Sequence, residues 1–141
     1  MEAKRRLLIV DDDPDFAGAI SEILESAGYE TEIRYNPKQG WEALEADRYD
    51  LLLLDIMMGR GAEGVMMARK IHKDPSLQGM PVLIITGLRE QIAFLFPRKA
   101  IDPSFLPVDG LVEKPVEPDF LLERVGALIE ASEARVAGGG G

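Results

Sequence analysis

Four acidic residues that directly follow short apolar runs are the clearest chemical feature of this sequence. Asp11–Asp13 come after one run and Asp55 after another, while two later runs end at Thr86 and lead to Lys114. In an open parallel α/β sheet, the carboxyl ends of the strands meet at one edge, and the working site lies there. We therefore expect carboxylates, a hydroxyl and an ammonium to lie together at that edge.

The residue types in this set predict metal-dependent phosphoryl chemistry. Several carboxylates in one pocket repel one another, so they need a cation. Oxygen ligands without histidine or cysteine favour Mg²⁺ or Mn²⁺ over zinc. A carboxylate is also a nucleophile that gives an acyl phosphate. Phosphoryl transfer needs positioning and charge neutralisation, which a metal ion, Lys114, Thr86 and backbone amides supply.

Each of these residues has a plainer interpretation when it is taken alone. Asp13 precedes a proline and fits a helix cap better than a metal ligand. A single aspartate after a strand is usually a turn residue, and a Lys-Pro pair is common. Only the ordered set, at the ends of successive strands, favours a functional site over these alternatives.

The apolar runs predict the strands that position the set. Most of them are continuous rather than alternating, as in strands of a parallel sheet that is covered on both faces. One segment alternates, which is typical of a more exposed strand. The continuous runs are Leu7–Val10, Leu51–Leu54, Val82–Ile85 and the weaker Leu111–Val112, and the alternating segment is Thr31–Tyr35.

Helical patterns lie between the strands and indicate an α/β fold with right-handed crossovers. Asp13-Pro14 and Asn36-Pro37 are helix starts, each with a capping side chain followed by proline. A third helix is expected over 62–73, and the last one begins at Pro118. The inward-facing residues expected on the helices are Phe16, Ile20, Ile23, Leu24, Ala27, Trp41, Leu44, Met67, Ala68, Ile71, Leu121, Leu122, Val125, Leu128 and Ile129.

The segment 88–108 should hold a fourth helix, but three prolines interrupt it. Proline removes a backbone donor and blocks a continuous helix, so we expect a short helix over 88–96 and then an irregular loop. A loop of this length in a compact domain is often functional. Its apolar side chains either pack beneath the loop or form an exposed patch for a partner. The prolines are Pro97, Pro103 and Pro107, and the apolar residues are Phe94, Leu95, Phe96, Phe105 and Leu106.

The composition is that of one ordinary globular domain, with 141 residues, 46% hydrophobic and 29% charged. The formal net charge of −9 disfavours direct binding to nucleic acid. There is no cysteine, no apolar run long enough for a membrane span, and no apolar run near the start long enough for a signal peptide. We expect a cytoplasmic monomer or weak homodimer that acts on neither nucleic acid nor membranes.

Over residues of about 5 to 134, the sequence resembles the receiver domains of bacterial two-component response regulators, of the stand-alone, single-domain type. The segments that carry the resemblance are Leu8–Pro14, Asp50–Met58, Ile84–Gly87 and Glu113–Pro115. It implies a doubly wound five-stranded parallel sheet of order 2-1-3-4-5, the flavodoxin-like receiver fold. The glycine-rich residues 135–141 are expected to form a flexible tail.

The resemblance also implies a role for each acidic residue. Asp55 would be the phosphoacceptor. Asp12, Asp55 and the backbone carbonyl of Met57 would ligate Mg²⁺ (or Mn²⁺), and Asp11 would hold the metal through water.

The same resemblance implies a signalling role. Thr86 and Lys114 would contact the phosphoryl group, which a histidine kinase or phosphotransfer protein would donate. The domain would catalyse its own phosphorylation and dephosphorylation without being an enzyme for a separate substrate. We expect the segment 88–111 to carry the signal to an unidentified downstream protein.

Several features depart from the family pattern. The segment Met58–Gly64 after the acceptor lacks the usual proline and is one residue longer. Gly87 stands where the family has alanine, and Thr86 and Lys114 are 28 positions apart (114 − 86), which is more than usual. Leu111 occupies the place of the family's aromatic switch residue. We therefore expect loop repacking rather than a ring rotation on phosphorylation.

Two other functions remain open from the residues. A pseudo-receiver would keep the fold as a protein-interaction domain without phosphotransfer, and the unusual segment 88–108 favours it. An aspartyl-nucleophile phosphatase would use the Asp-x-Asp spacing within Asp11–Asp13. That class usually needs more chain, and it would leave Asp55 unexplained.

Overall fold

The computed structural model of the chain describes residues 4–56, 58, 63–87 and 109–139. Met57, the segment 88–108 and most of the segment that follows Asp55 therefore lie outside the described residues. The expected irregular fourth-helix region falls there.

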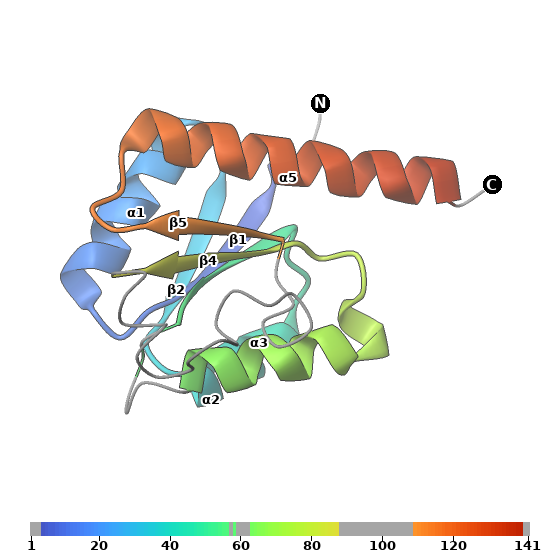
Figure 1. Cartoon of the computed structure of the whole chain (residues 1–141), viewed down its shortest axis with the longest axis horizontal. Coiled ribbons are helices and arrows are strands. Elements are labelled where there is room, and N and C mark those ends of the chain that lie inside the picture. Colours follow the sequence, from blue (N-terminus) through green and yellow to red (C-terminus); the bar gives the residue numbers. More distant parts are fainter. Residues whose placement is uncertain (1–3, 57, 59–62, 88–108, 140–141) are drawn as a thin grey trace, which may run out of the picture.

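Five parallel strands form one sheet of order β2-β1-β3-β4-β5, as the sequence predicts (Figure 1). Each strand is short, and the three central strands are rich in buried aliphatic residues because helices cover both faces of the sheet. The edge strands β2 and β5 are more exposed. The strands are β1 (Arg6–Val10), β2 (Glu30–Arg34), β3 (Leu51–Asp55), β4 (Val82–Thr86) and β5 (Gly110–Glu113).

Helices α1 and α5 lie on one face of the sheet, and α2 and α3 lie on the other (Figure 1). The two predicted starts are confirmed: Asp13 caps α1 through the amides of Asp15 and Phe16, and Asn36 caps α2 through the amide of Gln39. None of the described helices has the length and apolar character that a membrane crossing requires. The bounds are α1 (Pro14–Ser26), α2 (Pro37–Ala46), α3 (Glu63–Lys73), the 3-10 turn η1 (Pro75–Leu77) and α5 (Pro118–Gly139).

Helix α5 continues to Gly139, so residues 135–139 of the expected tail are helical. Ala131 and Ala134 are strong helix formers and carry the helix past the sheet. The division of the chain at residue 134 stays a prediction.

Two apolar cores flank the sheet, because alternate side chains of each strand point to opposite faces. Leu52 and Leu54 of β3 face one core, and Leu51 and Leu53 face the other. The α2/α3 core contains Leu8, Val10, Ala43, Leu44, Leu52, Leu54, Ile56, Met58, Val65, Met67, Ala68, Ile71, Val82 and Ile84. The α1/α5 core contains Leu7, Ile9, Ala17, Ile20, Leu24, Leu51, Leu53, Leu83, Ile85, Val112, Leu121, Val125 and Ile129.

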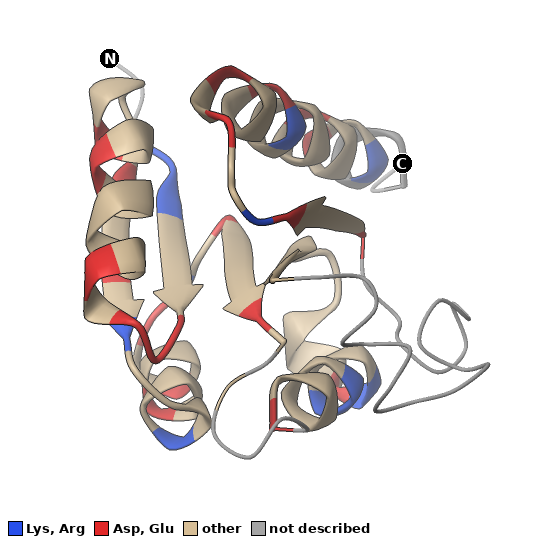
Figure 2. Cartoon of the chain, turned by 60° about the vertical axis from the view of Figure 1, so that its left-hand side comes forward, with Lys and Arg blue, Asp and Glu red and all other residues tan. Residues whose placement is uncertain are grey.

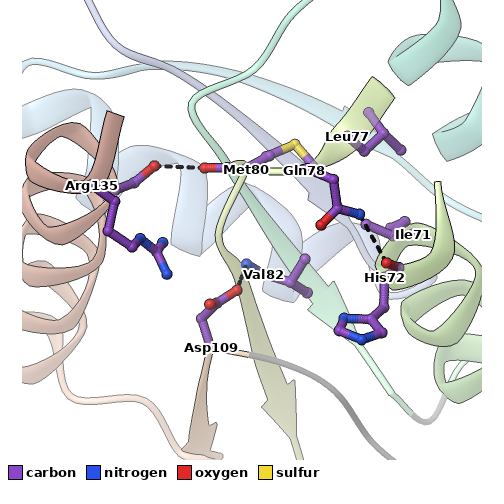
Figure 3. Close-up of a pocket in the computed structure, with 10 residues that line it drawn as sticks. Ile71, His72, Leu77, Gln78, Met80, Val82, Asp109 and Arg135 are labelled. Carbon is purple, nitrogen blue, oxygen red and sulfur yellow. Dashed lines mark hydrogen bonds between the residues drawn. The ribbon is translucent and has the colours of Figure 1, made fainter. Parts of the chain in front are cut away.

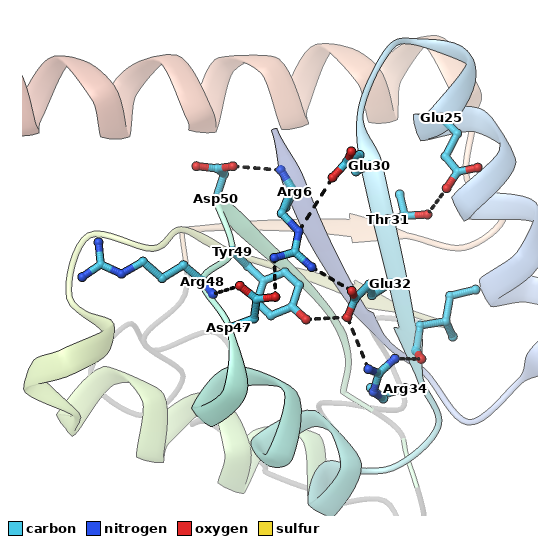
Figure 4. Close-up of polar contacts among 11 residues, drawn as sticks. Arg6, Glu25, Glu30, Thr31, Glu32, Arg34, Asp47, Arg48, Tyr49 and Asp50 are labelled. Atoms are coloured by element: carbon cyan, nitrogen blue, oxygen red, sulfur yellow. Dashed lines mark hydrogen bonds and ion pairs between the residues drawn. The ribbon is translucent and has the colours of Figure 1, made fainter. Parts of the chain in front are cut away.

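Polar contacts tie the amino ends of the strands together (Figure 4). The side chain of Asp50 accepts a hydrogen bond from the backbone N–H of Arg6 at 2.8 Å. The Arg6 guanidinium pairs with Glu32 at 2.7 Å and with Asp47 at 2.5 Å. These contacts hold β1, β2 and β3 at the edge opposite the aspartate cluster.

Candidate functional site

The strand register brings the acidic residues together at the carboxyl edge of the sheet. Val10 of β1 pairs with Leu54 of β3, so the residues that follow them, Asp11 and Asp55, lie side by side. Figure 2 shows acidic residues in red where these central strands end, and a basic residue in blue directly after β5. The predicted gathering of side chains at this edge is confirmed.

Asp11, Asp12 and Asp55 form a carboxylate cluster, and one oxygen from each lies within 4.8 Å of the others. Asp11 is 1% exposed and Asp55 5% exposed, whereas Asp12 is exposed. Three carboxylates at this spacing repel one another, and the ammonium of Lys114 offsets only one of the three charges. The donor set is all oxygen, which suits a hard divalent cation such as Mg²⁺. The cluster therefore fits a metal ion.

Lys114 lies beside two of the three carboxylates. Its Nζ is 3.6 Å from Asp11 Oδ2 and 3.7 Å from Asp55 Oδ2. The backbone also fixes it, because the N–H of Lys114 donates to the carbonyl of Thr86 at 2.7 Å. An ammonium held beside the Asp55 carboxylate can neutralise the negative charge of a group that binds at this position.

Thr86 ends β4 with a fully buried side chain. Its Oγ1 has no hydrogen-bond partner among the described residues. A buried hydroxyl without a partner costs about 1–3 kcal/mol and calls for an explanation, such as a ligand that completes its bonding. Asp55 pairs with Ile85, one residue before Thr86, so this hydroxyl belongs to the same edge as the cluster.

The turn after β1 links the cluster to helix α1. Asp11 Oδ1 accepts a hydrogen bond from the N–H of Asp13 at 2.9 Å. Asp13 in turn caps α1 through the amides of Asp15 at 3.1 Å and Phe16 at 3.2 Å. Asp13 is thus a helix cap, as expected, and it does not belong to the carboxylate cluster.

Burial raises the pKa of Asp11 to about 6 from its ordinary value of 3.8. The hydrogen bond from Asp13 and the charge of Lys114 act in the opposite direction, while Asp55 adds to the rise. The cause is physical: a carboxylate removed from water and placed beside another carboxylate holds its proton more tightly. A cation bound at the cluster would favour the ionised form of Asp11 and so lower its pKa.

Two contributors to this site were not assigned to it from the sequence. Phe16 is expected only in the apolar stripe of α1, but its ring centroid lies 4.0 Å from Lys114 Nζ. Gly64 belongs to the segment after Asp55, and a Cβ there would lie 2.4 Å from the backbone oxygen of Asp55. Met57 lies outside the described residues, so its predicted carbonyl ligand stays a prediction.

The hollow between η1 and α5 lies at the other end of the sheet (Figure 3). It has a volume of about 400 Å³ and lies between the ends of α3 and α5 and the starts of β4 and β5. The Ser132 hydroxyl donates across it to the carbonyl of Gly79 at 2.5 Å. Because Val82 and Asp109 line it at the amino ends of the strands, this hollow takes no part in the aspartate cluster.

Comparisons with known proteins agree with this geometry. The sequence matches the profile of the response regulator receiver domain over residues 7–126. It is 28% identical over 130 residues to the DNA-binding response regulator MtrA of Mycolicibacterium smegmatis, a match that covers 92% of this chain and 53% of MtrA. It is 29% identical over 141 residues to the phosphate regulon transcriptional regulatory protein PhoB of Pseudomonas aeruginosa, covering 96% of this chain and 58% of PhoB. The chain thus spans little more than half the length of these relatives.

Solved structures show the same fold. The crystal structure of a CheY-like response regulator receiver domain protein from Methanospirillum hungatei matches with a TM-score of 0.78 and 30% identity, over 94% of this chain and 99% of that one. The signal receiver domain of a signal transduction histidine kinase from Syntrophus aciditrophicus matches with a TM-score of 0.76 and 26% identity, over 90% of this chain and 91% of that one.

Proposed function

The chain belongs to the family of response regulator receiver domains, and from that premise we propose that it accepts a phosphoryl group on Asp55 in a Mg²⁺-dependent reaction. The observation that carries the proposal is the constellation around Asp55. One buried carboxylate has two further carboxylates within 4.8 Å and the Lys114 ammonium 3.7 Å away. The next strand end carries the Thr86 hydroxyl, which has no hydrogen-bond partner in the part of the chain that the structure describes.

The choice of Asp55 among the three aspartates rests on its surroundings. Asp11 uses one oxygen to hold the turn through the N–H of Asp13. Asp12 is exposed to solvent, whereas Asp55 is buried. Asp55 alone ends the central strand, between Asp11 directly after β1 and Thr86 at the end of β4.

The chemical step is a transfer from a phosphohistidine of a histidine kinase or phosphotransfer protein. A carboxylate oxygen of Asp55 attacks phosphorus, the O–P bond forms, and the N–P bond breaks. The imidazole nitrogen keeps the bonding pair and takes up a proton from solvent. Such a transfer depends on positioning and on charge neutralisation more than on covalent help from the protein.

The residues around Asp55 supply that help. Lys114 offers an ammonium and Thr86 a hydroxyl donor to the oxygens of the incoming phosphoryl group. Asp12 and Asp55 would hold Mg²⁺ together with the Met57 carbonyl, and Asp11 would act through water. When bound, the ion supplies positive charge for the phosphoryl oxygens and relieves the repulsion among the carboxylates.

Intact mass after incubation with acetyl phosphate and Mg²⁺ tests the acceptor. We expect one added phosphoryl group on the wild type and none on Asp55→Asn. Asp15→Asn is the matched control, because Asp15 is an exposed acid at the start of α1 and is not part of the cluster. Labelling of Asp55→Asn to the wild-type level would overturn the assignment.

Thermal unfolding with added Mg²⁺ tests the metal site. A ligand at one hundred times its Kd stabilises the native state by about 2.7 kcal/mol. We expect a rise in Tm for the wild type and for Asp15→Ala, and a much smaller rise for Asp12→Ala. Equal shifts in all three proteins would mean that Asp12 holds no ion.

The same pair of experiments separates the main alternative, a pseudo-receiver that binds partners without phosphotransfer. That protein would take up no phosphoryl group, even with Mg²⁺ bound. The cytoplasmic location and an output surface over 88–111 also stay proposals from the sequence. Hydrogen exchange with and without beryllofluoride would test the output surface. The proposal predicts that amide protection changes across 88–111.

A further inference from the structure

The surroundings of the Lys114 ammonium are unusual for a lysine between carboxylates. Its distances to Asp11 Oδ2 and Asp55 Oδ2 are 3.6 and 3.7 Å. A strong charge-assisted hydrogen bond to a carboxylate is about 2.7–2.9 Å long. Neither carboxylate therefore holds the ammonium tightly.

An aromatic face lies beside the same ammonium. The Phe16 ring centroid is 4.0 Å from Lys114 Nζ, well within the distance of about 6 Å at which a ring attracts a cation. Lys114 is only 25% exposed, so the contact is partly shielded from water. Partial desolvation strengthens an attraction between a cation and a ring.

The position of Phe16 is set by the turn that carries the carboxylates. The N–H of Phe16 donates to Asp13 Oδ1 at 3.2 Å, and the N–H of Asp13 donates to Asp11 Oδ1 at 2.9 Å. The ring also packs against the α1/α5 core. Asp11, Asp13, Phe16 and Lys114 thus form a closed circuit of contacts around one corner of the site.

The ring still attracts the Lys114 ammonium when a metal ion occupies the site, whereas the attraction of the carboxylates is weaker in that state. A divalent cation neutralises two of the three carboxylate charges and repels the ammonium, so the attraction of Lys114 to Asp11 and Asp55 weakens. The quadrupole of a phenyl ring is unaffected by that neutralisation. A ring contact therefore keeps its strength in the state in which the ammonium has to meet a phosphoryl oxygen.

We propose that Phe16 is a positioning residue that holds the Lys114 ammonium at the acceptor site by a cation–π contact, and that this contact sets the rate of phosphoryl uptake. The inference rests on the proposed function of Asp55. It adds a residue from helix α1 that acts through Lys114 and does not itself touch the phosphoryl group.

Site-specific fluorination at Phe16 is the sharpest test, because fluorine weakens the negative ring face with little change in shape. Phenylalanine, 4-fluoro-, 3,5-difluoro- and pentafluorophenylalanine are placed at this position, and uptake from acetyl phosphate is measured at saturating Mg²⁺. We expect a stepwise fall in rate along the series. Phe16→Leu should be slower by about two- to thirtyfold, the range to which cation–π energies convert. Phe16→Tyr keeps an aromatic ring, so its rate should be within about threefold of the wild-type rate.

Phe120→Leu is the matched control, since Phe120 is 44% exposed on α5, and the cation–π contact of Lys114 among the described residues is with Phe16. Its uptake rate should equal that of the wild type. A rate that is the same throughout the fluorinated series, or a Phe16→Leu rate equal to that of the wild type, overturns the proposal. The fluorinated series also covers the case in which Phe16→Leu does not fold.

A second measurement is independent of phosphorylation. The ε-methylene protons of Lys114 should show an upfield ring-current shift in NMR spectra of the metal-free protein, and the shift should persist when Mg²⁺ is added. Phe16→Leu should abolish it. Disappearance of the shift on Mg²⁺ addition to the wild type contradicts the inference even if Asp55 is phosphorylated. A retained shift in a protein that takes up no phosphoryl group overturns the proposed function, and with it the effect on rate, while the contact itself stands.

Discussion

The packing of Gly64 against the acceptor strand yields a sharp prediction for Gly64→Ala. An ideal Cβ at Gly64 would lie 2.4 Å from the backbone oxygen of Asp55, 2.5 Å from Ile56 Cα and 2.7 Å from Ile56 O. Ordinary contacts of a Cβ begin at 3.4 Å. The atoms that stand in the way are backbone atoms of the acceptor strand and its continuation, so no side-chain rotation can relieve the overlap.

The start of α3 and the end of β3 must therefore separate by about 1 Å, a displacement of the size that costs about 10²-fold in rate when it misplaces a reacting group. Overpacking of this kind destabilises a domain by about 1–3 kcal/mol, which lowers the Tm by about 3–12 °C for a chain of this size. We expect Gly64→Ala to fold, to melt earlier, and to take up phosphoryl groups from acetyl phosphate about 10²-fold more slowly at a temperature where it is fully folded.

Gly18→Ala is the matched control for this substitution. Gly18 also lies in a helix, but nothing is within 4 Å of its would-be Cβ. Replacing a helical glycine with alanine in open space stabilises a protein by about 0.5–1 kcal/mol, so its Tm should rise and its uptake rate should not change. If Gly64→Ala matches the wild type in both Tm and uptake rate, the close approach of α3 to Asp55 affects neither stability nor phosphoryl uptake, and the reasoning is refuted.

Three further predictions concern protonation and polar contacts elsewhere. The pKa of Asp11 is about 6 in the folded protein, compared with an ordinary value of 3.8. Because the folded state binds this proton more tightly, the protonated side chain stabilises the fold below pH 3.8, and this stabilisation is lost as the pH rises to about 6. The unfolding free energy of the metal-free protein, measured in urea from pH 4 to 7 relative to Asp11→Asn, should fall over that window. Mg²⁺ competes with this proton, so titrations should show its affinity weakening as the pH falls below 6, and a pH-independent affinity would contradict the role of Asp11. Asp109→Ala should cost about 1–3 kcal/mol in urea unfolding, because the Asp109 carboxylate accepts from the N–H of Val82 at 2.8 Å, whereas Asp109→Asn keeps an acceptor and should cost less.

Most of the fold was predictable because its signals are local. Continuous apolar runs predicted four strands and an alternating segment predicted β2. The pairs Asp13-Pro14 and Asn36-Pro37 predicted two helix starts, which are confirmed by their capping hydrogen bonds. The end of α5 was harder to predict, because glycines at a helix end signal a stop and yet tolerate continuation.

The site was predictable only in part. A parallel sheet gathers its strand ends whatever the details of packing. The residues that end a strand or closely follow one are Asp11, Asp12, Asp55, Thr86 and Lys114. The roles of other residues depend on distances across the fold. An aromatic residue in an apolar stripe gives no sign that its ring faces a lysine about one hundred residues later (114 − 16 = 98). A glycine in the first turn of a predicted helix, such as Gly64, gives no sign that backbone atoms lie against it.

The sheet contributes side chains to both apolar cores, and this arrangement determines how the domain unfolds. Leu52 and Leu54 contribute to the α2/α3 core, and Leu51 and Leu53 of the same strand contribute to the α1/α5 core. A strand buried on both faces cannot leave one core and stay in the other, so loosening either side exposes both. Cooperative, all-or-none melting follows from this arrangement. Trp41, the sole tryptophan of the sequence, packs against the α2/α3 core, and we expect its fluorescence to report the melting of the entire domain.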